Sequence, residues 1–390
     1  MTGHKILVVD DEPDLQMLMM QKFRHKVKSK EYEFLFAENG EEALNVVSHH
    51  NDLSLILSDI NMPKMDGLTL LDELQGLNRN DLRTVIVSAY GDMDNIRTAM
   101  NRGAYDFVTK PIDFKDLETT IEKTLSEIVK FLKSKEIEEQ LEALNHDLDM
   151  AARIQQKILH QEFPVFPDDD RFDIFANMIA AKHVGGDFYD FFKFDDDRLA
   201  FFIGDVAGKG MPAAIYMAVC RTMLKAIGSE VEDPAECIEK VNNMLIPESD
   251  ISTFVTVFYG VLDLKTGELS YCNGGHNLPY VQTKDGNVKE LENVGGLLLG
   301  KFEGAPYEMT TVQLEPGDAV VTFTDGVTEA EDEGDGFFDE ERVIAYLKKH
   351  PGKTLESIVK GLFLEVMKFT GAAEQSDDIT VLSVRYGSPE

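Results

Sequence analysis

Cysteine, long apolar runs and signal-like segments are scarce in this sequence. Its three cysteines, Cys220, Cys237 and Cys272, are odd in number and widely spaced, which supports neither a disulfide framework nor a zinc ribbon. We therefore expect reduced thiols in the protein core. No run of about 18 uncharged apolar residues occurs, and the first residues lack the regions of a signal peptide. These absences predict a soluble, cytoplasmic protein without a membrane partner.

Positive charge is also in short supply. The sequence has 38 Lys and Arg residues against 71 Asp and Glu residues, which gives a formal net charge of −33. Such a surface repels the phosphate backbone of nucleic acids and anionic lipid. We therefore expect no direct binding to nucleic acid. At 390 residues the chain is long enough for more than one domain.

The first 125 residues alternate short apolar runs with amphipathic stretches. Five of the runs are typical of buried strands, namely Ile6–Val9, Phe34–Phe36, Leu53–Leu57, Thr84–Val87 and Phe107–Thr109. Helical patterns lie between them. This alternation predicts an α/β domain in residues 1–125 with a doubly wound parallel sheet, whose ligand site lies at the carboxyl ends of the strands.

Polar residues close these predicted strands and should therefore lie together. They are Asp10, Asp11, Asp59, Ser88 and Lys110. Neighbouring carboxylates repel one another until a hard divalent cation such as Mg²⁺ neutralises them. The Asp59 carboxylate could then attack a phosphoryl group, while Lys110 and the Ser88 hydroxyl bind the phosphoryl oxygens. The pattern predicts a reversible aspartyl phosphate at Asp59.

Residues 4–125 resemble the response-regulator receiver family. The likeness rests on Val9-Asp10-Asp11-Glu12, Asp59-Ile60-Asn61-Met62-Pro63, Ser88-Ala89 and Thr109-Lys110-Pro111. It implies that Asp59 accepts the phosphoryl group and that Asn61 offers a backbone carbonyl to the metal. Phe107 would occupy the aromatic switch position, and the Lys110–Pro111 peptide would be cis. A histidine kinase or another phosphodonor is the implied partner, and an inert domain of the same fold is the alternative.

The next segment, residues 126–164, is rich in charged residues and favours a helical linker. Apolar residues recur at coiled-coil spacing in two sets, Ile121, Leu125, Ile128 and Leu132, then Ile137, Leu141, Leu144, Leu148 and Ala151. A step of five residues from Leu132 to Ile137 shifts the phase between the sets. We expect two chains to pair here as a homodimer. The alternative is a single helix packed on its own domains.

Residues 165–390 contain longer strand-like runs, which are Phe172–Ala176, Leu199–Ile203, Phe254–Leu262, Glu268–Cys272, Ala319–Phe323 and Ile379–Val384. Helical patterns occupy Met211–Ile227, Ala235–Leu245, Glu340–Lys349 and Leu355–Phe369. Successive strands joined by short turns indicate antiparallel hairpins. We expect an α/β sandwich of antiparallel sheets flanked by helices.

Four acidic motifs stand out in this region. They are Val184-Gly185-Gly186-Asp187, Gly204-Asp205-Val206-Ala207-Gly208-Lys209-Gly210, Thr324-Asp325-Gly326 and Ser376-Asp377-Asp378-Ile379-Thr380. Glycine permits close approach of backbones, so carboxylates from distant segments can converge. Two divalent ions roughly 3.5–4 Å apart would then activate a water for attack on phosphorus, without a nucleophilic side chain.

The motifs resemble those of the PPM phosphatases, in particular the bacterial branch of SpoIIE and RsbU, over about residues 150–386. The resemblance implies that Asp205 bridges two Mn²⁺ or Mg²⁺ ions and that the site is completed by Asp187, the Val206 carbonyl, Asp325 and Asp377. Asp378 is expected beside the ligands, because the pair Asp377-Asp378 leaves the ligand assignment open by one position. His276, in Asn273-Gly274-Gly275-His276-Asn277, is also expected beside the ligands, because oxygen-rich sites suit these metals better than imidazole does.

Together the resemblances imply a response regulator that hydrolyses phosphoserine or phosphothreonine on a partner protein, under control of Asp59 phosphorylation. The branch implies that the partner is an anti-sigma-factor antagonist with a STAS domain. The alternative is a non-catalytic adaptor that binds its target through a PPM-type domain. Acidic residues at every expected carboxylate position favour the enzyme. The charge disfavours a DNA-binding response regulator.

Overall fold

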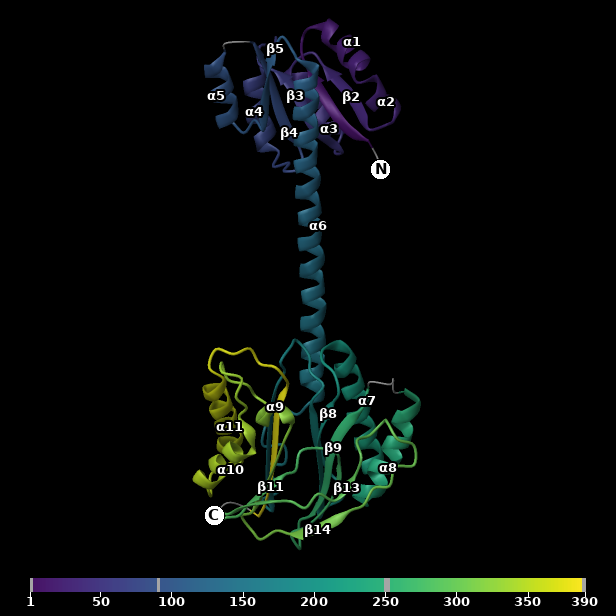
Figure 1. The fold of residues 1–390 in the computed structure, drawn as a ribbon, viewed down its shortest axis with the longest axis vertical. Helices are drawn as coiled ribbons and strands as arrows, with labels where there is room; N and C mark the ends of the chain where they lie inside the picture. Colours follow the sequence, from purple (N-terminus) through teal and green to yellow (C-terminus); the bar gives the residue numbers. More distant parts are fainter. Residues whose placement is uncertain (1–2, 90–91, 249–252, 388–390) are drawn as a thin grey trace. The chain divides into compact units, whose positions relative to one another are not determined.

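The computed structural model describes residues 3–89, 92–248 and 253–387, and it divides the chain into two compact units, Met1–Leu144 and Asn145–Glu390 (Figure 1). The helix α6 (Phe114–Ile158) belongs to both. The predicted linker, residues 126–164, is therefore shared between the units. No helix in the described ranges combines the length and the apolar character that a membrane span requires.

The first unit contains a parallel sheet with the strand order β2-β1-β3-β4-β5. Its strands are β1 (His4–Val9), β2 (Tyr32–Ala37), β3 (Leu53–Asp59), β4 (Arg83–Ala89) and β5 (Asp106–Lys110). Its helices are α1 (Pro13–Lys22), α2 (Arg24–Lys28), α3 (Gly40–His49), α4 (Gly67–Gly76) and α5 (Met93–Asn101). The predicted doubly wound α/β domain is confirmed, and all five predicted strands occur.

The first turns of α6 complete the core of this unit. Ile121, Leu125 and Ile128 are between 0 and 4% exposed and pack against the sheet. The prediction that Ile121, Leu125 and Ile128 form part of a seam between two chains is therefore wrong. An amphipathic helix on a sheet repeats its apolar residues at nearly the same spacing as a coiled coil, so spacing could not separate the two.

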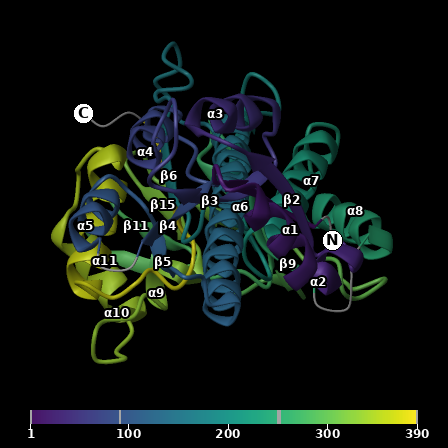
Figure 2. The same ribbon diagram turned by 90° about the horizontal axis from the view of Figure 1, so that it is seen from above.

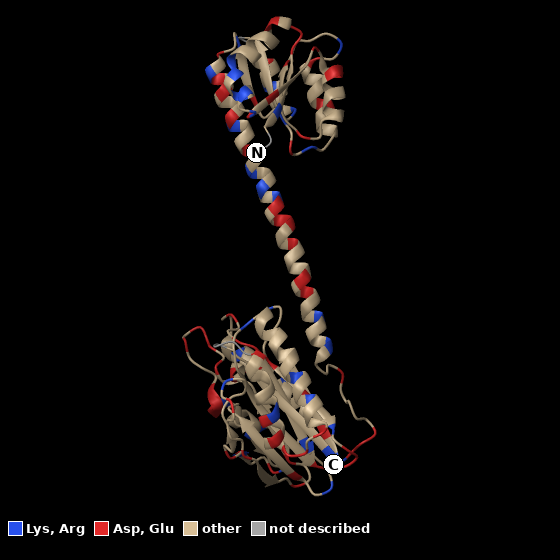
Figure 3. Ribbon diagram, turned by 90° about the vertical axis from the view of Figure 1, so that its right-hand side faces the viewer, with Lys and Arg blue, Asp and Glu red and all other residues tan. Residues whose placement is uncertain are grey.

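The second set behaves differently. Ile137, Leu141 and Leu144 are 55–56% exposed, and Leu132, the last member of the first set, is 44% exposed. Acidic and basic residues are interspersed along this stretch of α6 (Figure 3). The middle of the helix is thus amphipathic but has an apolar side that its own chain leaves exposed.

The second unit is a sandwich of two sheets between two pairs of helices. One sheet holds β7 (Phe188–Lys193), β8 (Arg198–Val206), β9 (Val255–Asp263), β10 (Glu268–Gly274), β13 (Gly295–Gly296) and β14 (Thr310–Gln313). The other holds β6 (Phe172–Ile179), β11 (Tyr280–Gln282), β12 (Val288–Glu290), β15 (Ala319–Phe323) and β16 (Ile379–Tyr386). Every pairing is antiparallel except that of β10 with β13, which confirms the predicted fold class.

Helices cover both outer faces of this sandwich (Figure 2). The first sheet contacts α7 (Met211–Gly228) and α8 (Pro234–Leu245), which is followed by a short 3₁₀ helix, Ile246–Glu248. The second contacts α10 (Asp339–Lys349) and α11 (Leu355–Thr370). The four-residue helix α9 (Asp325–Thr328) directly follows the loop after β15.

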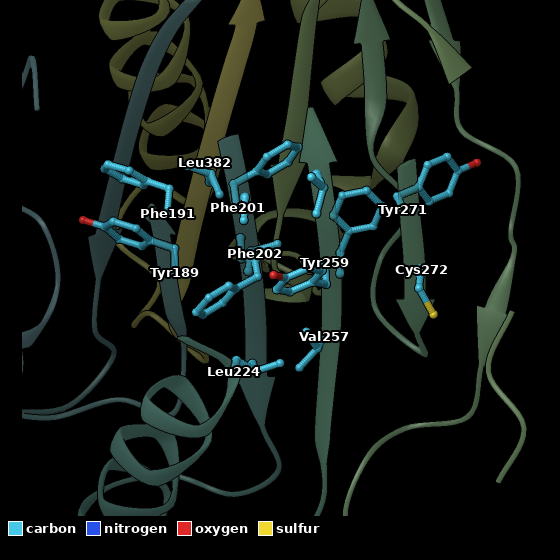
Figure 4. Packing of buried hydrophobic residues seen from close by; sticks show 14 of the residues in the cluster. Tyr189, Phe191, Phe201, Phe202, Leu224, Val257, Tyr259, Tyr271, Cys272 and Leu382 are labelled. Carbon is cyan, nitrogen blue, oxygen red and sulfur yellow. The ribbon is translucent and has the colours of Figure 1, made fainter. Parts of the chain in front are cut away.

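The sandwich core is packed with aromatic rings from neighbouring strands (Figure 4). Phe202 and Tyr259 stack with their ring centroids 5.9 Å apart. The five residues of β8 from Leu199 to Ile203 are all fully buried, because a sheet covered on both faces requires apolar side chains on both. The three cysteines are free and buried, as expected. Asp205 and Val206 therefore lie at the end of a strand that is held rigidly on both sides.

Candidate functional sites

At the carboxyl ends of the parallel strands the structure brings Asp10, Asp11 and Asp59 together. One carboxylate oxygen of each residue lies within 4.8 Å of those of the other two, and no other such group of three ligand residues occurs in the described part of the chain. Burial raises the pKa of Asp10. Lys110 Nζ donates to Asp59 Oδ2 at 2.7 Å and to Asp10 Oδ2 at 3.0 Å. This set of oxygens fits a hard divalent cation.

Ser88 is fully buried, and its hydroxyl has no hydrogen-bond partner in the described structure. An unsatisfied buried hydroxyl costs about 1–3 kcal/mol, so a ligand that supplies an acceptor would be stabilised here. Asn61 is exposed and Phe107 is 37% exposed. The Lys110–Pro111 peptide is cis, as the resemblance implied.

In the second unit, the four acidic motifs place their aspartates on four different elements. Asp187 precedes β7, Asp205 lies near the end of β8, Asp325 begins α9 and Asp377 precedes β16. Asp187 is 1% exposed. Its Oδ2 accepts hydrogen bonds from Thr324 Oγ1 at 2.7 Å and from Thr380 Oγ1 at 2.6 Å. Thr324 directly follows β15 and Thr380 lies in β16, so the second sheet holds a carboxylate that precedes β7 of the first sheet.

Burial and mutual repulsion dominate the electrostatics of these carboxylates. Burial, followed by repulsion from Asp325 and Asp377, raises the pKa of Asp205 to about 7. Burial and the Asp205 charge hold the pKa of Asp187 well above its usual value. Burial and Asp377 also raise the pKa of Asp325. Divalent cations would relieve this repulsion, and the donor set of oxygens suits Mg²⁺ or Mn²⁺.

Glycines allow the ligand-bearing segments to approach closely. A Cβ atom on Gly186 would lie 2.7 Å from the Val206 carbonyl oxygen, and one on Gly326 would lie 1.9 Å from the Asp378 carbonyl oxygen. Backbone would have to move to admit either side chain. The glycines in the motifs thus keep the Val206 carbonyl next to the loop of Asp187.

The two residues expected beside the ligands occupy structural positions. Asp378 accepts hydrogen bonds from the backbone N–H groups of Ala181 at 2.8 Å and Gly186 at 2.7 Å, so it holds the loop that carries Asp187. His276 is buried, and its Nδ1 lies 2.9 Å from Thr256 Oγ1. Thr256 pairs with Asp205 across β8 and β9.

Sequence reasoning missed two side chains at this site. Gln155, near the end of α6, is buried; its Nε2 donates to the Gly185 carbonyl at 2.7 Å, and its Oε1 accepts from the Gly185 N–H at 3.1 Å. Lys209 Nζ donates to Asp377 Oδ2 at 2.8 Å and to the Ser376 carbonyl at 2.6 Å. The signals were a glutamine among apolar helix residues and a lysine inside an acidic motif.

Two family models match the sequence. The model described as "Response regulator receiver domain" matches residues 6–122, and "Stage II sporulation protein E (SpoIIE)" matches residues 195–387. Sporulation initiation phosphotransferase F of Bacillus subtilis is 31% identical over 125 residues, which cover 32% of this chain and 96% of that protein. The chain belongs to the response-regulator family, and its second domain is a SpoIIE-type PPM domain.

Other relatives and folds agree with this pairing of domains. The phosphoserine phosphatase RsbU of Bacillus subtilis is 29% identical over 243 residues, or 62% of this chain and 70% of RsbU. Protein IcfG of Synechocystis is 28% identical over 284 residues, so the chain spans only 44% of that relative's length. The SiaA-PP2C domain of Pseudomonas aeruginosa has the same fold as the SpoIIE-type domain. Its TM-score is 0.56 at 22% identity, covering 63% of this chain and 98% of that one.

Proposed function

We propose that the SpoIIE-type domain hydrolyses phosphoserine or phosphothreonine on a partner protein. The observation that carries this proposal is that Asp187, which is buried, and Asp205 and Asp325, which are half-buried, have carboxylates that are repelled by neighbouring carboxylates and whose pKa values are all raised. Asp377 and the Val206 carbonyl would complete the ligand set. Two Mn²⁺ or Mg²⁺ ions bound there would supply an activated water for in-line attack on phosphorus.

The chain's own residues would fix the geometry of this reaction. Asp205 is held by the rigid strand β8 and faces the other three segments, so it is the proposed bridging ligand. The hydroxyls of Thr324 and Thr380 fix the orientation of the Asp187 carboxylate. Asp378 fixes the loop in which Asp187 lies. Such supporting hydrogen bonds orient metal ligands and tune their affinity.

We further propose that phosphorylation of Asp59 in the receiver domain controls this hydrolysis. A histidine kinase or another phosphodonor would transfer the phosphoryl group with Mg²⁺ bound by Asp10, Asp11 and Asp59, and the unpartnered Ser88 hydroxyl would donate to it. The similarity to RsbU, a phosphoserine phosphatase by name, supports a phosphorylated STAS-domain antagonist of an anti-sigma factor as the partner.

The substitution Asp205→Asn tests the catalytic proposal. It keeps the size of the side chain but removes the bridging charge, so hydrolysis of a phosphoserine peptide with Mn²⁺ should fall by at least about 100-fold. Glu268→Gln, on the exposed end of β10, is the matched control and should retain activity. Wild-type turnover in Asp205→Asn would refute the metal assignment. A wild-type chain that binds its partner but releases no phosphate would favour the adaptor.

A further inference from the structure

Lys209 lies on the exposed side of the carboxylate site of the SpoIIE-type domain. It lies in the loop between β8 and α7, four residues after Asp205, and reaches the segment before β16. Its Nζ is 2.8 Å from Asp377 Oδ2 and donates to the Ser376 carbonyl at 2.6 Å. The side chains of Lys209 and Asp377 are 42% and 34% exposed. The ammonium group thus lies at the solvent edge, against a proposed metal ligand.

The loop backbone is shaped for this contact. Gly208 and Gly210, on either side of Lys209, have φ values of +104° and +80°, a region that side chains rarely adopt. No heavy atom lies within 4 Å of a Cβ built on either glycine, so the glycines serve the backbone conformation and not close packing. The loop is open around its lysine.

The positive charge of Lys209 stabilises the ionised form of carboxylates that a bound metal would also stabilise. The hydrogen bond to Asp377 raises the pKa of Lys209, and Asp378 and Asp325 add to the effect. In return the ammonium opposes the rise in the pKa of Asp325. In this arrangement no three of the domain's described carboxylates bring their oxygens within 4.8 Å of one another. Asp377 instead forms an ion pair with Lys209 of its own chain.

We propose that Lys209 is a resident counter-ion of Asp377, which a divalent metal must displace to bind there. The inference rests on the proposed function, because it takes Asp377 as a metal ligand. An ammonium and a divalent ion repel each other at contact distance, so the two compete for the Asp377 Oδ2 atom that Lys209 contacts. Lys209 therefore lowers the metal affinity of this site, and any movement of the loop before α7 changes that affinity.

Mn²⁺ binding to the full chain, measured by isothermal titration and by electron paramagnetic resonance of free Mn²⁺, tests the proposal. All proteins carry Asp11→Asn, which weakens the separate receiver site. Lys209→Gln keeps a hydrogen-bond donor but removes the charge, and should bind Mn²⁺ about tenfold more tightly at the Asp377 site. Lys209→Arg should bind like the parent. Lys265→Gln, which removes another lysine paired with an aspartate at the far end of β9, should also bind like the parent.

A second substitution separates the possible outcomes. In an Asp377→Asn background, Lys209→Gln should cause no further change in affinity, because the paired carboxylate is gone. Unchanged or weaker Mn²⁺ binding by Lys209→Gln alone would overturn the counter-ion role and leave the catalytic proposal standing. If Asp205→Asn binds Mn²⁺ as the parent does, the metal assignment itself fails and the role of Lys209 fails with it.

Discussion

His276 is a buried side chain that gives the SpoIIE-type domain a pH-dependent stability. Burial lowers its pKa to about 4, whereas a histidine in an unfolded chain has a pKa of about 6.5. Between these values the unfolded state binds more protons, so stability must fall as pH falls through this window. From pH 7 to pH 4.5, we expect the free energy of unfolding to drop by on the order of 1–3 kcal/mol through this group.

Chemical denaturation at a series of pH values, with chelator present, measures this effect. His276→Gln should lose less stability between pH 7 and pH 4.5 than the wild type does. His25→Gln, which changes an exposed histidine of α2, should keep the wild-type slope. Equal slopes for wild type and His276→Gln would contradict a buried neutral imidazole.

Asp59 gives the receiver domain its proposed covalent chemistry. Its Oδ2 is paired with Lys110 and its Oδ1 accepts from the Ile60 N–H at 2.7 Å. Acetyl phosphate with Mg²⁺ should add one acid-stable, hydroxylamine-labile phosphate to the wild type and none to Asp59→Ala. Ser88→Ala should slow labelling, because it removes the unpartnered donor. Mass spectrometry of the intact chain counts the phosphates, and full labelling of Asp59→Ala would move the acceptor elsewhere.

Among individual residues, the sequence predicted the aspartates near strand ends better than the polar side chains that bind a backbone carbonyl. Three of the four aspartates of the SpoIIE-type domain, Asp187, Asp205 and Asp325, lie beside glycines, and that local pattern predicts the close approach of their segments. Gln155 and Lys209 instead bind the carbonyls of Gly185 and Ser376, which are distant in sequence. Only the assembled sandwich brings those carbonyls within reach.

Among the elements, α6 has three different environments along its length. Its first turns are buried in the receiver core, its middle is exposed, and Gln155 near its end is buried in the second unit, as is Leu159 directly after it. The apolar spacing of the sequence predicted the helix correctly. It could not tell burial against a sheet from pairing with another chain, since both require an apolar face of similar period.

The end of α6 is connected to the proposed metal site by Gln155. Its amide makes two hydrogen bonds with Gly185, two residues before Asp187. Gln155→Ala should loosen that loop and lower both Mn²⁺ affinity and hydrolysis by about 10–100-fold, the usual effect of losing a support behind a metal ligand. Gln156→Ala, which changes the exposed neighbour on the same helix, should leave both unchanged. Equal activity in the two variants would show that the contact has no role in the site.

At the scale of the whole molecule, packing within one chain does not account for the exposed apolar residues in the middle of α6. Ile137, Leu141 and Leu144 are each at least 55% exposed. A second copy of the same helix would bury this apolar side in a coiled coil. We therefore expect the full chain to be a homodimer, now through residues 132–148 and not through Ile121, Leu125 and Ile128. Sedimentation equilibrium measures the state directly.

Control by Asp59 requires that phosphorylation favours one of two arrangements of the helix and the SpoIIE-type domain. If the pair of helices transmits that preference, Leu141→Glu with Leu144→Glu should give a monomer whose hydrolysis no longer depends on the phosphorylation of Asp59. Gln140→Glu adds a charge at a neighbouring polar position of the helix and should keep both the dimer and the response. A wild type that is monomeric with and without acetyl phosphate would exclude the paired-helix route. A monomeric double variant that still responds would place the coupling within one chain, where Gln155 is the connection to test.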